Sequence, residues 1–250
     1  EANVVGLTGL IGNPSGYKAV MECDLLIMLG TDFPYTDFLP ENTKTIQIDI
    51  RSENIGNRTP VTLGLHGDLF TTVQKLINVC DAKTDDAFLV SLRERFSKYK
   101  DKMHDQADPS RDMEPLHPQI FSKMVSDHAS LDAIFTIDTG TSAIWASNYM
   151  SFHSDRRIIG SFNHGSMAVG LPAAIGAQLL HPEREVWTLM GDGAFNMCLQ
   201  DFSTAVHNQL PIKIIIFNNS QLGFVKIEME EAGLAPNFDA LRVQNFDFAA

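Results

Sequence analysis

The sequence predicts an α/β protein with two doubly wound, mainly parallel sheets and flanking helices. First, short apolar runs of strand length alternate with stretches of helical length along most of the chain. Second, the apolar runs Glu185–Met190 and Ile212–Phe217 flank about one helix, which is the pattern of a βαβ unit with parallel strands. Third, a change of composition over residues 81–115 separates one α/β unit, residues 1–80, from another, residues 116–250.

The first unit is predicted to contain three strands and two helices. The strands are apolar runs bounded by turn residues: Leu25–Leu29, which we expect to be buried, Thr45–Ile50 and Val61–Leu65. The helices are Tyr17–Met21 and a segment that ends near Val79. Asp68 precedes this second helix and is of the residue type preferred at a helix N-cap.

Residues 81–115 differ from both flanking units, because 16 of these 35 residues are charged. Apolar residues nevertheless recur at spacings of three and four, at Phe88, Leu92, Phe96, Tyr99 and Met103. That periodicity predicts an amphipathic helix with one packed face. A short polar linker, residues 105–115, is expected to follow it.

The second unit is predicted to continue the alternation of helices and strands. Its helices are expected at Gln119–Ser126, Ser142–Tyr149, Ala168–Leu180 and from near Gln221. Its strands are expected at Ala133–Ile137, Arg157–Ile159 and the two apolar runs named above.

Composition narrows the classes of partner and location. The chain has 19 basic and 31 acidic residues and a formal charge of −12, which argues against nucleic acid as a partner. The three cysteines show no metal spacing, so a reducing cytoplasm is expected. No apolar run is long enough to span a bilayer. The chain opens without Met and ends without an evident stop signal, so we expect a piece of a longer protein.

Oxygen-bearing side chains follow both strands of the βαβ unit. Asp192 comes directly after the first strand, and Asn219 follows the second, 27 residues later. Ligands of open α/β sheets bind at the carboxyl edge where these residues are expected to meet. Gly191 and Gly193 would let the backbone approach a ligand closely. A lone Gly-Asp-Gly is a common turn, but the two halves together predict a site for Mg²⁺ and a phosphate.

The pattern Gly-Asp-Gly, 24 residues, Asn-Asn resembles the cofactor motif of thiamine-diphosphate-dependent enzymes. The resemblance implies Mg²⁺ ligands at Asp192, Asn219 and the main-chain oxygen of Gln221. It implies diphosphate contacts from Gly193, Ala194 and the turn Ser220, Gln221, Leu222, Gly223, Phe224 and Val225.

The segment Gly165-Ser166-Met167 extends the resemblance, since it lies 25 residues before Asp192, counted from Met167. In the family a bulky apolar residue at this place supports the cofactor in a bent shape, which implies that role for Met167. An ordinary core methionine at a helix start is the alternative.

Further segments resemble pyruvate oxidases and the quinone-linked pyruvate dehydrogenase. They are Ser161-Phe-Asn-His-Gly-Ser-Met-Ala168 and Asn218-Asn-Ser-Gln-Leu-Gly-Phe-Val225 in the second unit, and Gly6–Gly12, Leu29–Tyr35 and Ile46–Ile50 in the first. The resemblance implies a thiamine-diphosphate domain preceded by part of a Rossmann-like, FAD-binding middle domain. It implies FAD contacts from Thr8, Gly9, Leu10, Ile11, Thr31, Asp32, Phe33, Pro34, Tyr35 and Asp49.

Three further residues are candidates for the reaction itself. Glu228 stands where related oxidases carry an active-site acid, although a solvated helix face is an equal alternative. Phe224 is expected at the boundary between the thiamine and flavin sites. His164, of a residue type that often serves as a general acid or base, lies in the loop before Met167.

The resemblance implies oxidative decarboxylation of pyruvate, to acetate or acetyl phosphate, with thiamine diphosphate, Mg²⁺ and FAD. Electrons would pass to quinone or oxygen. The full-length enzyme would be a homo-oligomer, a dimer or a tetramer. It would be cytoplasmic, or would bind peripherally to the inner face of the cell membrane through a segment not in this chain. No segment resembles the domain that carries the family's activating glutamate, so this chain alone is expected to be inactive. Two alternatives stay open: an acetolactate synthase, which condenses two 2-keto acids, and a non-catalytic cofactor-binding subunit.

Overall fold

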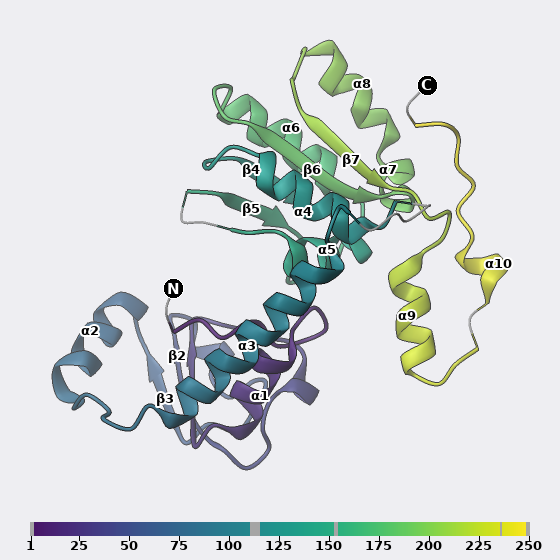
Figure 1. Cartoon of the computed structure of the whole chain (residues 1–250). Helices are drawn as coiled ribbons and strands as arrows, with labels where there is room; N and C mark the ends of the chain where they lie inside the picture. Colours follow the sequence, from purple (N-terminus) through teal and green to yellow (C-terminus); the bar gives the residue numbers. More distant parts are fainter. Residues whose placement is uncertain (1–2, 111–115, 153–154, 236, 249–250) are drawn as a thin grey trace. The chain divides into compact units, whose positions relative to one another are not determined.

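A computed structural model describes residues 3–110, 116–152, 155–235 and 237–248 (Figure 1). The chain divides into two compact units, Glu1–Lys102 and Met103–Ala250. Each unit contains one parallel sheet flanked by helices, as the alternation of apolar runs predicts. The predicted linker extends into residues 111–115, which lie outside the described residues.

The first unit holds a three-stranded parallel sheet in the order β1-β2-β3. The strands are β1 Leu25–Leu29, β2 Lys44–Asp49 and β3 Leu63–His66. The helices are α1 Pro14–Glu22, α2 Leu69–Val79 and most of α3 Ala87–Gln106, whose last four residues belong to the second unit, with single 3₁₀ turns η1 Thr36–Phe38 and η2 Ser52–Asn54. The strand predictions are confirmed, with β2 shifted by one residue and β3 beginning two residues later than expected.

Helix caps explain the starts of α1 and α2. The Asn13 side chain accepts a hydrogen bond from Gly16 N at 2.9 Å, and Pro14 occupies the first helical turn. α1 therefore begins three residues before the predicted start. The Asp68 carboxylate accepts from Thr71 N at 2.8 Å, which confirms the predicted cap of α2. The amphipathic helix predicted from residue 88 is also confirmed as α3, in which Leu92 is only 3% exposed.

The prediction that Leu25–Leu29 is a buried strand is wrong for the described chain. Leu25, Ile27 and Leu29 are each at least 40% exposed, whereas Met28 is 4% exposed. β1 is an edge strand, and its alternate side chains point to opposite faces of the sheet. A short apolar run does not reveal whether one or both of its faces are covered.

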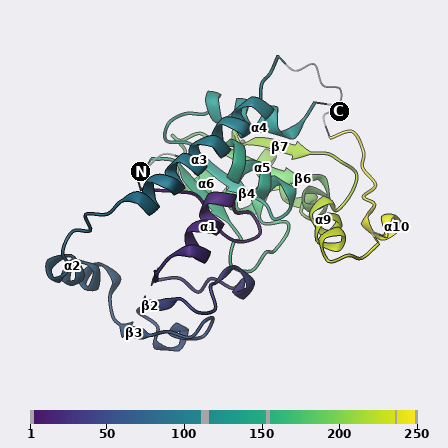
Figure 2. The ribbon, with the colours of Figure 1, turned by 60° about the horizontal axis from the view of Figure 1, so that its bottom comes forward.

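The second unit holds a four-stranded parallel sheet in the order β5-β4-β6-β7. The strands are β4 Ile134–Ile137, β5 Arg157–Gly160, β6 Val186–Gly191 and β7 Lys213–Phe217. The helices are α4 Pro118–His128, α5 Thr141–Tyr149, α6 Gly170–Leu180, α7 Asp192–Met197, α8 Leu199–His207, α9 Gly223–Glu231 and α10 Phe238–Leu241. α9 and α10 extend away from the carboxyl ends of β6 and β7 (Figure 2).

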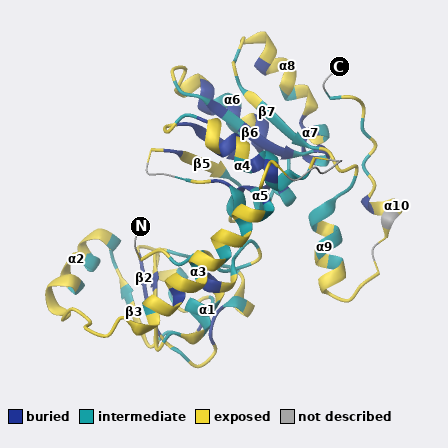
Figure 3. Ribbon diagram, in the orientation of Figure 1, coloured by how far each residue is buried: buried dark blue, intermediate teal, exposed yellow. Residues whose placement is uncertain are grey.

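The core of this unit lies on both faces of β4 and β6, where the buried residues concentrate (Figure 3). Phe135, Ile137 and Leu189 pack with residues of α4 and α5 on one face. Ile134 and Val186, of opposite parity along the same strands, pack with Ala174 and Ala177 of α6 on the other face. Helices on both faces of a parallel sheet make this a doubly wound arrangement.

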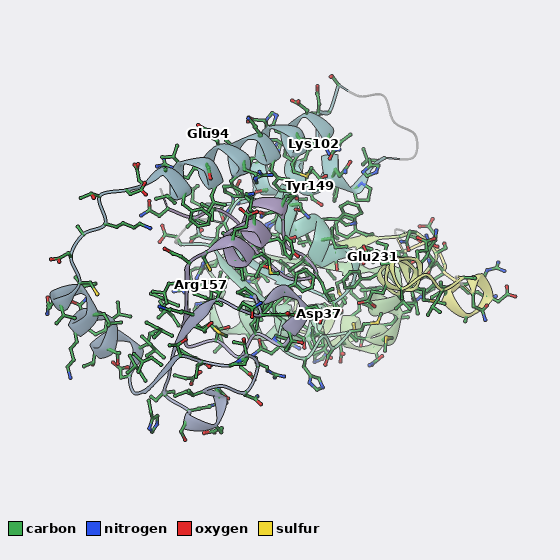
Figure 4. The ribbon with its side chains drawn as sticks, turned by 90° about the horizontal axis from the view of Figure 1, so that it is seen from below. Asp37, Glu94, Lys102, Tyr149, Arg157 and Glu231 are labelled. Carbon is green, nitrogen blue, oxygen red and sulfur yellow. The ribbon has the colours of Figure 1, made fainter. Side chains whose placement is uncertain are left out.

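Polar contacts fasten the helices of the α4–α5 layer. Tyr149, labelled in Figure 4, lies on α5. Its hydroxyl accepts a hydrogen bond from Gln119 Nε2 at 2.6 Å and donates one to Gln106 Oε1 at 3.1 Å. The carbonyls around the end of α4 are bound by the buried Arg156 guanidinium, which donates to Ser126 O and Ala129 O.

None of the described helices is long and apolar enough to cross a membrane. All three cysteines are free; Cys198 is buried, Cys23 is partly buried and Cys80 is exposed.

Candidate cofactor and metal site

The carboxyl ends of β6 and β7 lie side by side and carry the two halves of the predicted motif. Gly191 is paired with Phe217, so the residues that follow both strands emerge at one edge. Asp192 is 2% exposed, and its Oδ2 atom accepts a hydrogen bond from Ser220 N at 2.7 Å. Its Oδ1 atom accepts from Gly193 N at 2.9 Å. The predicted meeting of these two segments is therefore confirmed.

The turn after β7 has the shape of a cradle. Ser220 adopts a positive φ of 56°, and the Asn219 carboxamide oxygen accepts from Gln221 N at 3.1 Å. A Cβ on Gly193 would lie 2.9 Å from Leu222 Cδ2, and one on Gly223 would lie 2.8 Å from Asn219 Nδ2. A Cβ at either position would therefore displace the end of a side chain that lines the site.

A pocket opens between this turn and the end of β6. Ten of the residues predicted from the sequence to form the cofactor site line this pocket: Met167, Asp192, Gly193, Ala194, Asn219, Gln221, Leu222, Gly223, Phe224 and Val225. The segment Thr139–Thr141, together with Gly191 and Phe217, also lines it. Residues from the ends of β4, β6 and β7 therefore converge on one pocket with an apolar wall.

The loop that carries Met167 is held by Asp138, a residue to which the sequence analysis gave no role. Asp138 is fully buried at the end of β4. Its Oδ1 atom accepts from Ala168 N at 3.0 Å and its Oδ2 atom from Gly170 N at 2.7 Å. Thr139 Oγ1 donates to Ser166 O at 2.8 Å. Met167 is thus anchored on both sides.

Burial raises the pKa of the Asp138 carboxyl above its ordinary value, while the hydrogen bonds from backbone amides oppose that rise. Ala168 has a positive φ of 65°, which explains why α6 begins at Gly170 and not at Ala168 as predicted. An acid directly after a strand, the feature that revealed Asp192, was also the available signal for Asp138.

Two candidates for the reaction lie outside this pocket. The side chains of Glu228 on α9 and His164 in the loop after β5 are exposed, and neither residue lines the pocket. Phe224 does line it. Gly165 has a positive φ of 66°, and Ser166 N donates to Ser161 Oγ, so these two residues shape the Met167 loop. The roles of Glu228 and His164 stay predictions.

The segments predicted to contact FAD gather at the carboxyl edge of the first sheet. A Cβ atom on Gly9 would lie 3.1 Å from the Phe33 ring, so the loops Thr8–Ile11 and Thr31–Tyr35 are in contact. Asp32 forms a bidentate pair with Arg58, at 2.7 and 3.1 Å. Asp49 is 5% exposed at the end of β2 and accepts hydrogen bonds from Arg51 N and Asn54 Nδ2.

The donor set at the pocket suits a hard cation beside a phosphate. Among the described residues, no three His, Cys, Asp or Glu side chains gather at a metal-binding distance. A cation here would be held by the Asp192 carboxylate, the Asn219 carboxamide oxygen and the Gln221 main-chain oxygen, with phosphate oxygens completing its shell. Mg²⁺ binds through one or two carboxylates plus substrate phosphates in this manner.

Two family matches cover most of the chain. Residues 138–250 match the family described as thiamine pyrophosphate enzyme, C-terminal TPP binding domain. Residues 1–76 match thiamine pyrophosphate enzyme, central domain. The chain belongs to the thiamine pyrophosphate enzymes. The pocket described above falls within the matched cofactor-binding domain of this family.

Individual relatives agree with this membership. The chain is 38% identical over 98% of its length to the "Putative thiamine pyrophosphate-containing protein YdaP" of Bacillus subtilis. It is 32% identical over 89% of its length to the acetolactate synthase large subunit of Porphyra purpurea, and 30% identical over 89% to that of Corynebacterium glutamicum. These matches cover 42%, 38% and 36% of the relatives, so this thiamine pyrophosphate enzyme chain spans about two fifths of their length.

Proposed function

We propose that the protein containing this chain uses thiamine diphosphate and Mg²⁺ to decarboxylate a 2-keto acid, with pyruvate as the first candidate. The remaining two-carbon unit would be transferred to a second 2-keto acid, as in an acetolactate synthase. The observation that carries the proposal is the pocket in which Asp192, Asn219 and Met167 meet. The acetolactate synthases among the relatives support the choice of reaction.

Each part of the pocket has a role in this proposal. Asp192 and Asn219, with the Gln221 carbonyl, would hold the cation. The amides at the start of α9, where Phe224 and Val225 line the pocket, are available to phosphate oxygens. Met167 and Leu222 would supply an apolar wall, which lowers the local dielectric and strengthens the electrostatic contacts of the pocket. When bound, thiamine diphosphate supplies the electron sink for the loss of CO₂.

Oxidative decarboxylation of pyruvate is the second candidate. Its specific support is the resemblance of Ser161–Ala168 and Asn218–Val225 to pyruvate oxidases. The contact between the loops Thr8–Ile11 and Thr31–Tyr35 is compatible with a flavin at that edge of the first unit. FAD is a proposal for either reaction, supported by the resemblance of Gly6–Gly12, Leu29–Tyr35 and Ile46–Ile50 to a flavin-binding domain.

Product analysis separates these candidates. The full-length protein is supplied with pyruvate, Mg²⁺, thiamine diphosphate and FAD, with and without a quinone or oxygen. Acetolactate formed independently of the acceptor is the expected result. Acetate or acetyl phosphate formed only with the acceptor would replace the first candidate by the second. Failure to bind Mg²⁺ and thiamine diphosphate would leave a non-catalytic subunit.

A further inference from the structure

We propose that Asn245 is a positioning residue that holds the Asp192 carboxylate in its metal-binding orientation. The proposal rests on the function proposed above for this pocket. Asn245 lies in the segment after α10, residues 242–248, to which the sequence patterns assign no role. Figure 1 shows this segment, in yellow, running back past α7.

The Asn245 carboxamide nitrogen donates to the oxygens that follow both strands of the site. It lies 2.6 Å from Asp192 Oδ2 and 2.8 Å from Asn218 Oδ1. A carboxamide nitrogen carries two hydrogens, and these two short contacts use both of them. Asn245 therefore bridges the residue after β6 to the residue after β7.

The orientation of this amide is fixed from its other side. Asn196, on α7, donates through Nδ2 to Asn245 Oδ1 at 3.0 Å and also contacts Gln244 O. Because the oxygen of Asn245 faces the donor on Asn196, its nitrogen faces Asp192. All the hydrogen-bonding atoms of the Asn245 carboxamide are thus engaged, and a flipped amide would bring donor against donor.

The segment itself is attached to the cofactor turn through its backbone. Val243 N donates to Ser220 O at 2.9 Å, and Leu222 N donates to Leu241 O at 2.8 Å. Phe248 stacks edge-on against Phe195 of α7, with ring centroids 5.6 Å apart. Asn245 is therefore presented by a segment that is fastened on both sides, not by a free chain end.

The two carboxylate oxygens of Asp192 therefore have different roles: Oδ2 is held by the protein, and Oδ1 is available to a cation. Oδ2 accepts from Ser220 N and Asn245 Nδ2, which occupies it. Among the contacts of the described residues, Oδ1 accepts only from Gly193 N, which leaves lone-pair capacity for a cation. Removal of Asn245 frees the carboxylate to rotate, and outer-shell partners of this kind change metal affinity by about 10–100-fold.

The test measures Mg²⁺ affinity by calorimetric titration at saturating thiamine diphosphate, in the full-length protein. Asn245→Leu keeps the shape of the side chain but removes the donor, and Asn245→Ala removes both. Both variants are expected to bind Mg²⁺ about tenfold more weakly or worse. Asn196→Ala, which removes the hydrogen bond that orients the amide together with the longer contact to Gln244 O, is expected to show a smaller loss in the same direction. The matched control is Gln244→Ala, the exposed neighbour on the same segment.

The unfolding midpoint without cofactor separates positioning from folding. The expected midpoints of Asn245→Leu and Asn196→Ala are close to the wild-type value, so that the loss appears in metal affinity alone. Mg²⁺ affinity of Asn245→Leu within twofold of the wild-type value would overturn the proposal, and so would an equal loss in Gln244→Ala. Should Asn245→Leu fail to fold, unchanged affinity in Asn196→Ala overturns it. A wild-type protein that binds no Mg²⁺ with thiamine diphosphate contradicts instead the function on which the proposal rests.

Discussion

The backbone amide of Ser220 donates a 2.7 Å hydrogen bond to Oδ2 of Asp192, and this contact joins the ends of β6 and β7. It spans 28 residues of sequence. The bond fixes the turn that carries Asn219 relative to the buried carboxylate, so the two predicted metal ligands come from one rigid edge. A site built on strand ends holds its geometry more closely than one built on loops alone.

Asp192→Asn is expected to abolish tight binding of Mg²⁺ and thiamine diphosphate while preserving the fold. The substitution removes the one carboxylate among the predicted ligands at nearly constant shape. The loss should exceed the roughly 10–100-fold effect of outer-shell changes. Calorimetric titration measures it, with Asp239→Asn on the exposed surface of α10 as the control. Equal affinity in the wild-type and Asp192→Asn proteins would remove Asp192 from the ligand set.

Gly193→Ala is expected to weaken cofactor binding by steric conflict. The new Cβ would lie 2.9 Å from Leu222 Cδ2 and 3.7 Å from Met167 Cε, inside the pocket. Overpacking of this kind costs about 1–3 kcal/mol. Where that cost falls on the cofactor-bound state, it corresponds to about five- to 150-fold in affinity.

Gly176→Ala in α6 is the matched control for Gly193→Ala, since a Cβ there meets nothing within 4 Å. It should raise the unfolding free energy by about 0.5–1 kcal/mol, because alanine is the better helix former. Fluorescence titration and urea unfolding check the pair. Similar cofactor affinities for both alanine variants would contradict the steric conflict expected from a Cβ at residue 193.

Asp138→Ala should destabilise the second unit and release the Met167 loop together. It leaves the amides of Thr139, Ala168 and Gly170 without their buried acceptor. One such orphaned group costs about 1–3 kcal/mol, so a loss in that range or above is expected. Cofactor affinity should fall in parallel.

The control for Asp138 is Asp127→Ala on α4, whose carboxylate pairs with the Lys123 ammonium on the surface of the described helix. That change should cost at most about 0.5 kcal/mol. Thermal and urea unfolding give the stabilities. A variant at residue 138 as stable as this control would show that the buried hydrogen bonds of Asp138 contribute little.

Glu185 is expected to make the second unit sensitive to acid. Partial burial alone would raise the pKa of this carboxyl, but the Ser130 N–H bond and Lys213, whose ammonium lies 3.0 Å away, lower the pKa to about 2. The unfolded value is about 4.3. A depressed folded pKa contributes stability that is present above the unfolded pKa and is lost as pH falls from about 4.3 to about 2.

Glu185→Gln should therefore cost about 1 kcal/mol at neutral pH and flatten the fall of stability below pH 5. Urea unfolding followed from pH 7 to pH 3 measures both effects. Glu183→Gln, whose side chain is 69% exposed, serves as the control and should follow the wild-type curve. Parallel curves of unfolding free energy against pH for the wild-type and Glu185→Gln proteins would show that Glu185 does not cause the acid sensitivity.

Most of the fold could be predicted from local sequence. The strands and helices of both units follow apolar periodicity, and the cap at Asp68 marks the start of α2. What local pattern could not supply was the extent of burial. The side chains of Leu25, Ile27 and Leu29 depend on what covers the sheet, which is a property of the assembled unit.

The sequence by itself determined that Asp192 and the Asn218–Asn219 turn meet, because strands joined by a right-handed crossover place their carboxyl ends at one edge. The resemblance to the family implied a place for Met167 beside this site, and Met167 does line the pocket. Only the tertiary structure decided that Asp138 anchors the Met167 loop and that Asn245, 53 residues beyond Asp192, donates to its carboxylate. It also left Glu228 and His164 in solvent. The physical reason is that these contacts depend on the path of loops and of the segment after α10, where no periodic pattern constrains the chain and only packing against the finished sheet determines where a side chain lies.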